Sequence, residues 1–250
     1  NSTFAMGTNS VSSDGSSTIQ VDPGSTLQIG GAAGISFTGA GWVYSPANTI
    51  SGIVEYTAGT LAINASLPSG LTTLGGLVIS GGNRTTGASF SINGDVSVTS
   101  AVADAINIGA TTLTVGGDLA GTGAVTCGTG TLRIGGSAGF TNVGTFTPGS
   151  GTLEYNRAGN QTAVRATAYN NFTLSGGGTK TLITGTVTVS GVLATTGAAV
   201  MVDATAASTI RVAGNLTCDA STTFSTNTTV TLEGTAAQTV GGTGAALAFN

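Results

Sequence analysis

Apolar and polar residues alternate in short stretches along most of the chain. The segment 209–216 reads Thr-Ile-Arg-Val-Ala-Gly-Asn-Leu, in which two apolar residues flank one polar position and a pair containing Gly follows. Alternation with a period of two residues indicates a β-strand. Gly follows where the chain has to turn, because it enters left-handed backbone conformations without a steric cost. Related segments are 27–31, 113–119, 132–136, 187–191 and 230–234.

These strands recur about every 20 residues. Leu113 precedes Leu132 by 19 residues, and Leu132 precedes Leu153 by 21. Such a period fits one coil of a solenoid, in which each coil buries its apolar side by stacking on its neighbours. We therefore expect an all-β fold, a parallel β-helix of about 11 to 13 coils with roughly 20 residues per coil. The right-handed form is the expectation, although the pattern itself does not determine the hand.

A single solenoid domain is expected over residues 1–250. Residues 1–25 are the least regular segment, residues 35–76 carry a longer loop, and residues 77–250 form the regular coils. Trp42 is expected to pack this loop and not to serve as a ligand platform. Because only 5% of the residues are aromatic, the core is expected to consist mainly of stacked aliphatic side chains.

Low charge excludes several classes of partner. The chain has 6 basic and 10 acidic residues, which gives a formal net charge of −4. Scattered basic residues form no phosphate-binding patch, so we expect no nucleic-acid partner. No apolar run approaches the roughly 18 to 20 residues of a spanning helix, so we expect no membrane insertion. The 42 Gly residues and the few charges are unusual for a compact enzyme.

The two cysteines, Cys127 and Cys218, are 91 residues apart. At one coil per 20 residues and about 4.8 Å per coil, they are separated by roughly 20 Å. A disulfide requires Cα atoms within about 7 Å. We therefore predict two free thiols that face the interior.

Three segments carry a resemblance to a known group. They read Gly-Thr-Leu-Arg-Ile-Gly-Gly at 130–136, Gly-Thr-Leu-Glu-Tyr at 151–155 and Tyr-Asn-Asn-Phe-Thr-Leu-Ser-Gly at 169–176. This sequence resembles the Gly/Thr-rich repeats of bacterial secreted β-solenoids, such as autotransporter passengers and filamentous-haemagglutinin-type adhesins. The resemblance implies an extracellular structural or adhesive role at the cell surface, with surface glycans as binding partners of an adhesin. It carries over no catalytic residues.

An enzyme is the alternative of a different class, because some β-helices that resemble this chain cleave acidic polysaccharides with carboxylates and calcium. The chain has no His, which is the commonest general base and metal ligand. We expect no catalytic residues and no cofactor.

Asp95 and Asp118 are the candidate ligands for Ca²⁺. They take the same place after a Gly in two successive coils, where direct stacking would let them share the ion. The competing interpretation is a corner role, in which the side chain stabilises the turn between two strands, because Asp and Asn readily bond to the backbone of their own turn. Ser137 and Asn215 take this place in other coils, and the corner role is our expectation.

The outward positions of the repeated strand are expected to form one column along the rod. The column comprises Gln28, Thr114, Arg133, Glu154, Thr188, Arg211 and Thr231. A regular rank of Thr on a flat face would favour an ice-binding protein. Charged residues interrupt this rank, and Arg133 lies one coil from Glu154, so a solvated face with a weak ion pair is the stronger interpretation.

A longer repeat overlies the coil period. Ser-Gly-Ile-Val-Glu-Tyr at 51–56 returns 99 residues later as Ser-Gly-Thr-Leu-Glu-Tyr at 150–155, and Gln-Thr at 161–162 returns at 238–239. We interpret this as duplication of a module with gain or loss of a coil. Seven Asn-x-Ser/Thr sequences are candidate glycosylation sites. They begin at Asn1, Asn64, Asn83, Asn160, Asn171, Asn215 and Asn227.

The two ends of the chain are expected to join copies of the protein. Residues 1–4 placed after residue 250 give Phe-Asn-Asn-Ser-Thr-Phe, close to the internal Tyr-Asn-Asn-Phe-Thr at 169–173. Unpaired strand edges template association, so we predict a head-to-tail homopolymer that builds a filament or sheath. The alternative is that this chain is one period of a longer tandem polypeptide. The predicted interface comprises Asn1, Ser2, Thr3, Phe4, Leu247, Phe249 and Asn250.

Overall fold

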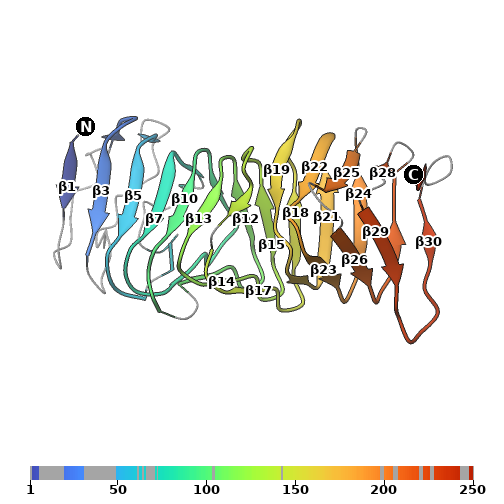
Figure 1. The fold of residues 1–250 in the computed structure, drawn as a ribbon. Helices are drawn as coiled ribbons and strands as arrows, with labels where there is room; N and C mark the ends of the chain where they lie inside the picture. The colour runs from blue at the N-terminus through green and yellow to red at the C-terminus, as the bar shows by residue number, and fades with distance from the viewer. Residues whose placement is uncertain are drawn as a thin grey trace.

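The computed structural model is a rod of stacked parallel β-coils (Figure 1). Its longest sheet spans about 9 stacked coils of roughly 21 residues each, which confirms the predicted all-β parallel solenoid. No helix in the described part of the chain is long and apolar enough to span a membrane. The structure describes residues 2–5, 20–30, 49–60, 62–63, 65, 71, 73–102, 105–141, 143–197, 200–204, 208–219, 222–225, 228–242 and 248–249.

Successive strands of one coil lie on three different faces, which we name A, B and C. Face A consists of a seven-stranded and a five-stranded sheet. The first holds β1 (Thr3–Ala5), β3 (Thr26–Ile29), β5 (Ile53–Tyr56), β7 (Gly76–Ile79), β10 (Val96–Val98), β13 (Leu119–Gly121) and β16 (Phe140–Thr141). The second holds β19 (Gln161–Val164), β22 (Gly178–Leu182), β25 (Val200–Ala204), β28 (Thr223–Phe224) and β31 (Ala248–Phe249). The two sheets meet where β16 contacts β19.

Face B consists of a two-stranded and a nine-stranded sheet, which meet where β4 contacts β6. The first holds β2 (Gln20–Val21) and β4 (Thr49–Ile50). The second holds β6 (Thr73–Leu74), β9 (Phe90–Ile92), β12 (Thr112–Val115), β15 (Thr131–Ile134), β18 (Thr152–Tyr155), β21 (Asn171–Ser175), β24 (Leu193–Thr196), β27 (Leu216–Thr217) and β30 (Val240–Gly241).

Face C consists of two four-stranded sheets. One holds β8 (Arg84–Thr85), β11 (Ile106–Asn107), β14 (Val125–Thr126) and β17 (Phe146–Thr147). The other holds β20 (Ala168–Tyr169), β23 (Thr186–Val189), β26 (Ser208–Val212) and β29 (Thr228–Leu232). The rings of Phe146 and Tyr169 link the two sheets, with centroids 5.8 Å apart.

Alternation of side chains builds the core. In β12, Leu113 and Val115 are buried, while the alternating Thr112 and Thr114 are only partly buried. The register aligns Leu113 with Leu132 on β15. Leu132 aligns in turn with Leu153 on β18, so the coil period read from these leucines is confirmed. Thr and Val favour this extended, pleated backbone because their β-branched side chains suit it.

Aromatic rings fill the middle of the rod, which the low aromatic content did not predict. Tyr169 and Phe172 stack with centroids 4.4 Å apart and an interplanar angle of 6°. Tyr155 meets Phe172 edge to face at 5.9 Å. All three side chains are buried. The core here therefore depends on a few large rings as well as on stacked aliphatic residues.

The predicted 11 to 13 coils agree with the strands of face A. Its seven-stranded and five-stranded sheets hold twelve described strands, one per coil, whereas the nine-stranded sheet of face B is continuous over about 9 coils. Coils near the N-terminus use more residues than the regular period. The partners Gln28 and Glu55 on β3 and β5 are 27 residues apart. Trp42 and most of the predicted 35–76 loop lie outside the described residues.

The predicted single column of outward residues does not exist. Gln28 is on face A, Thr114, Arg133 and Glu154 are on face B, and Thr188, Arg211 and Thr231 are on face C. All three faces carry the same alternating pattern, so sequence similarity among strands did not identify the face. These seven positions therefore give no single rank along the whole rod for ice binding. The ion pair between Arg133 and Glu154 is present, with Nε 2.8 Å from Oε2.

Both cysteines are free and buried, as predicted. Burial raises the pKa of the Cys127 thiol to about 12. It also raises the pKa of the Cys218 thiol, while a hydrogen bond with Thr195 acts in the opposite direction.

Candidate binding groove

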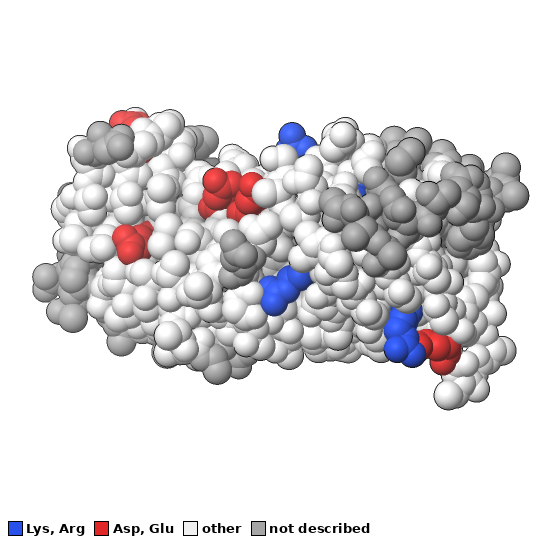
Figure 2. Space-filling view, viewed as in Figure 1, with Lys and Arg blue, Asp and Glu red and all other residues white. Residues whose placement is uncertain are grey.

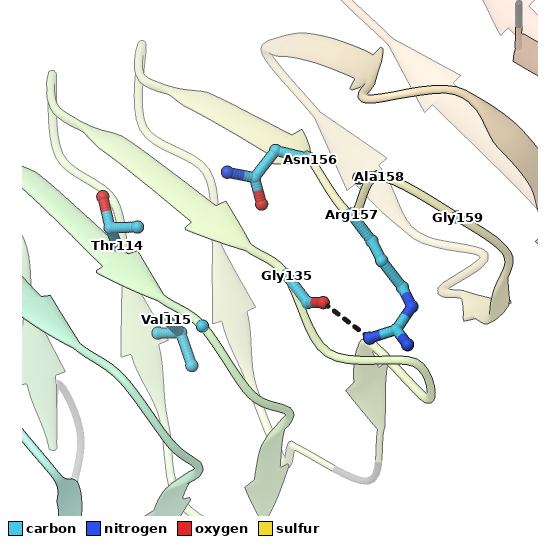
Figure 3. A pocket seen from close by; sticks show the side chains of 8 residues that line it. Thr114, Val115, Gly135, Asn156, Arg157, Ala158 and Gly159 are labelled. Carbon is cyan, nitrogen blue, oxygen red and sulfur yellow. Dashed lines mark hydrogen bonds between the residues drawn. The ribbon is translucent and has the colours of Figure 1, made fainter.

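A groove of about 470 Å³ lies at the corner between faces B and A (Figure 3). Three successive coils form it, because Val115 on β12, Ile134 on β15 and Tyr155 on β18 are in register. The residues that follow these strands therefore stack at the corner. The lining residues are Thr114, Val115, Gly116, Gly135, Asn156, Arg157, Ala158 and Gly159.

Glycine leaves the floor of the groove without side chains. A Cβ atom on Gly116 would lie 2.5 Å from the carbonyl oxygen of Asn93 in the preceding coil. A Cβ atom on Gly135 would lie 2.9 Å from the carbonyl oxygen of Gly116. Backbones that approach this closely exclude any larger residue. The hollow is thus a consequence of coil stacking at this corner.

One wall is the loop 156–159, which the buried side chain of Gln161 fixes to the preceding coil. Gln161 is 0% exposed. Its Nε2 donates to the carbonyls of Ile134 and Gly136, both at 3.0 Å, and its Oε1 accepts from the Arg157 N–H at 3.3 Å. The amide therefore connects the start of this loop to the corner below it.

Lys180 fixes the same loop from the following coil. Lys180 is 0% exposed, and its Nζ donates to the carbonyls of Arg157 at 2.7 Å and Gly159 at 3.1 Å. Burial, and secondarily the charge of Arg157, lowers the pKa of the Lys180 ammonium to about 8. A buried ammonium is costly unless it is hydrogen bonded, so the two carbonyls account for its position.

Arg157 places a cation at the mouth of the groove. Its Nη1 donates to the Gly135 carbonyl at 3.2 Å, and the residue is exposed. Arg133 and Arg211 each pair with a glutamate, whereas Arg157 forms no ion pair with a described residue. A guanidinium has five N–H donors, so most of its donors remain available to a ligand.

The groove therefore offers a cation, hydroxyl and amide groups, and backbone. None of its lining residues is Asp, Glu, His or Cys. A pair of titratable groups for acid and base chemistry is absent from these eight positions. The arrangement is suited to binding an anion and hydrogen-bonding groups.

Sequence reasoning did not find this groove. The repeated Gln at 161 and 238 was the available signal, because Gln238 fixes its own corner in the same way. Its Nε2 donates to the carbonyls of Val212 and Gly214, and its Oε1 accepts from the Gly234 N–H.

Asp95 and Asp118 lie in successive coils, as the calcium hypothesis required, but their carboxylates bond to backbone N–H groups. Asp95 Oδ1 accepts from the Asp118 N–H at 2.8 Å. Asp118 Oδ1 accepts from the N–H groups of Ala138 at 2.9 Å and Gly139 at 2.7 Å. Both carboxylates therefore bond at corners, but to backbone N–H groups of the next coil, whereas the corner interpretation expects bonds to their own turn. Calcium binding shared by Asp95 and Asp118 stays a prediction, and none of these hydrogen bonds favours it.

Replacing Asp118 by Ala should lower the free energy of unfolding by about 1–3 kcal/mol, because two N–H groups lose their acceptor. Asp118→Asn keeps an acceptor oxygen and should cost less than half as much. Urea unfolding with and without a calcium chelator measures both effects. A chelator that lowers the stability of the unmodified protein, but not of Asp118→Ala, would restore the calcium hypothesis.

The candidate glycosylation sites differ in their surroundings. Asn83 is exposed. Three others hold the backbone of the next coil: Asn160 Oδ1 accepts from the Thr179 N–H, Asn171 Oδ1 from the Val192 N–H, and Asn215 Oδ1 from the Thr239 N–H. Asn83 is thus the described site at which a sugar would disturb the fewest contacts. Asn1, Asn64 and Asn227 lie outside the described residues.

The predicted assembly residues lie at opposite ends of face A. Thr3 and Phe4 belong to β1, which pairs with β3. Phe249 belongs to β31, which pairs with β28. Ser2 precedes β1, and its carbonyl accepts from the Thr26 N–H at 2.9 Å. Asn1, Leu247 and Asn250 lie outside the described residues.

Comparison of the chain with protein-family models, curated proteins and solved structures found no match.

Proposed function

We propose that this solenoid is a non-enzymatic structural protein that stacks end to end with further copies of itself. The supporting observation is the position of β1 and β31. They are the first and last strands of face A, and each pairs with one described strand. The outer edges of β1 and β31, which pair with no other described strand, belong to the same face, so a second copy placed on the axis would continue that face. Open parallel edges of this kind template association.

Phe4 adds to this support. It aligns with Leu27, which points into the core, yet Phe4 is 61% exposed. Another coil stacked on β1 would cover this ring as β5 covers the side chain of Leu27. Burial of apolar surface would then favour the contact.

An extracellular position at a cell surface completes the proposal. It rests on the solenoid fold together with the resemblance to secreted autotransporter passengers and haemagglutinin-type adhesins. Figure 2 shows a surface made mostly of uncharged residues, with charged side chains scattered over it. Such a surface suits a stacked fibre, because it places few like charges against one another.

A proline at position 3 tests the assembly. Ser2 uses its carbonyl to pair with β3, and successive residues of a strand direct their backbone groups to opposite sides, so the Thr3 N–H points to the free edge. Thr3→Pro removes that donor and leaves the bonds to β3. It should produce a folded monomer at concentrations where Thr3→Ala, which keeps the N–H, still forms filaments.

Sedimentation velocity and electron microscopy give the assembly state, and circular dichroism gives the fold. If the unmodified chain stays monomeric at roughly millimolar concentration, or if Thr3→Pro assembles as Thr3→Ala does, the head-to-tail proposal is wrong.

A further inference from the structure

We propose that the groove beside the loop 156–159 binds an acidic polysaccharide, with Arg157 contacting a carboxylate or sulfate group. This inference is independent of end-to-end stacking, because the groove lies in the middle of the rod and β1 and β31 lie at its ends. The ligand class follows from the charge, the shape and the rigidity of the groove.

The charge of the groove is positive on a protein whose formal net charge is −4. Arg157 lies at the surface, and the Lys180 ammonium lies behind it against the Arg157 carbonyl. The nearby acidic side chains already have partners. Glu154 accepts from Arg133 and from the Ser175 hydroxyl, and Asp118 accepts from two backbone N–H groups. An incoming anion therefore meets the Arg157 guanidinium, which no described carboxylate neutralises, while the buried Lys180 ammonium adds positive charge behind the loop.

The lining favours a saccharide over a peptide. The floor is glycine backbone, and Thr114 and Asn156 supply hydroxyl and amide groups at its side (Figure 3). No aromatic or large aliphatic pocket is present among the lining residues to hold the side chain of a peptide. The groove also crosses three coils along the rod axis, which suits an extended polymer that offers a hydroxyl or an acidic group at each step.

The position of Arg157 is set before any ligand binds. Gln161 holds its N–H and Lys180 holds its carbonyl, and both of these side chains are buried. Its guanidinium is further fixed by the Gly135 carbonyl. A group that is ordered in advance loses little conformational entropy on binding, and a guanidinium matches a carboxylate or sulfate with two parallel hydrogen bonds.

Isothermal titration with oligogalacturonate, dextran sulfate and neutral dextran tests the proposal on the full chain. Oligogalacturonate or dextran sulfate should bind, neutral dextran should not, and the stronger of the two anionic probes identifies carboxylate or sulfate as the recognised group. Arg157→Gln should weaken binding of that probe about tenfold or more. Arg133→Gln, which removes an exposed Arg already paired with Glu154, should change it less than twofold.

Poly-glutamate serves as the peptide probe at matched charge. The proposal is wrong if Arg157→Gln binds the anionic saccharides as well as the unmodified chain does, if Arg133→Gln weakens binding equally, or if poly-glutamate binds more tightly than both saccharides. Sedimentation of the same Arg157→Gln sample should show unchanged end-to-end assembly. Failure of binding and failure of assembly are therefore separate results.

Discussion

Phe172→Ala is expected to lower the free energy of unfolding by about 3–5 kcal/mol, as other truncations of large buried rings do. Phe172 lies at the centre of the aromatic cluster, stacked on Tyr169 at 4.4 Å and meeting Tyr155 edge to face at 5.9 Å. It is 0% exposed, and neighbouring coils cannot close over the space because their backbones are held at the strand spacing. Removing the ring therefore leaves a cavity and breaks two ring contacts.

The matched control is Thr173→Ala, one residue further along β21, where the side chain is partly exposed and the register partner is Glu154. We expect it to change the free energy of unfolding by less than about 1 kcal/mol. Urea unfolding followed by circular dichroism compares the two variants. Equal losses for both would show that the aromatic cluster does not stabilise the middle of the rod more than an ordinary outward position does.

The fold class was predictable because one physical constraint repeats along the chain. Leu113, Leu132 and Leu153 had to stack to be buried, and the structure aligns them in one register. Free thiols followed from the same geometry, because a coil period places Cys127 and Cys218 too far apart to join. Both conclusions depend only on the period, which is a local property of the sequence.

Assignment of strands to faces was not predictable from strand patterns. From β7 onward each coil has three strands on three faces, so a unit of about seven residues repeats within the roughly 21-residue coil. A shift by one such unit moves a motif to another face without changing its sequence. The glutamates Glu55, Glu154 and Glu233 show this. Glu55 lies in β5 on face A, Glu154 lies in β18 on face B, and Glu233 follows β29 on face C.

The contact between Arg and Glu recurs in two of these three copies, although they belong to different faces. Glu154 accepts from Arg133 in the preceding coil, and Glu233 accepts from Arg211 in the same relation. Glu55 accepts from Gln28 instead. The 99-residue repeat is thus a recurring strand and corner, and it does not restore the same face. Duplication of whole coils does not describe it.

The groove could not be predicted from the sequence because two residues that shape it, Lys180 and Gln161, depart from the alternation of apolar and polar residues in a strand. Lys180 takes an inward position of β22, where alternation predicts an apolar residue and charge predicts exposure. Gln161 begins β19 and is also buried. Only the structure shows that each faces backbone carbonyls of another coil. These are positions at which tertiary hydrogen bonds override the local preference of the side chain.

Gln161→Met is expected to lower the free energy of unfolding by about 2–5 kcal/mol, because the Gly136 carbonyl and the Arg157 N–H lose their partner and the Ile134 carbonyl keeps only its bond from the Asn156 N–H. Methionine has a similar length and adds no charge, so the change isolates the amide.

The control variant, Gln238→Met, removes the same three kinds of bond, but Gln238 is only partly buried. Water can replace its bonds, so the loss should be less than half as large. Urea unfolding of both variants compares them, and an equal or larger loss for Gln238→Met would show that burial does not set the strength of this corner. Because Gln161 also positions Arg157, its replacement should weaken binding of the anionic saccharide, whereas Gln238→Met should leave that binding unchanged.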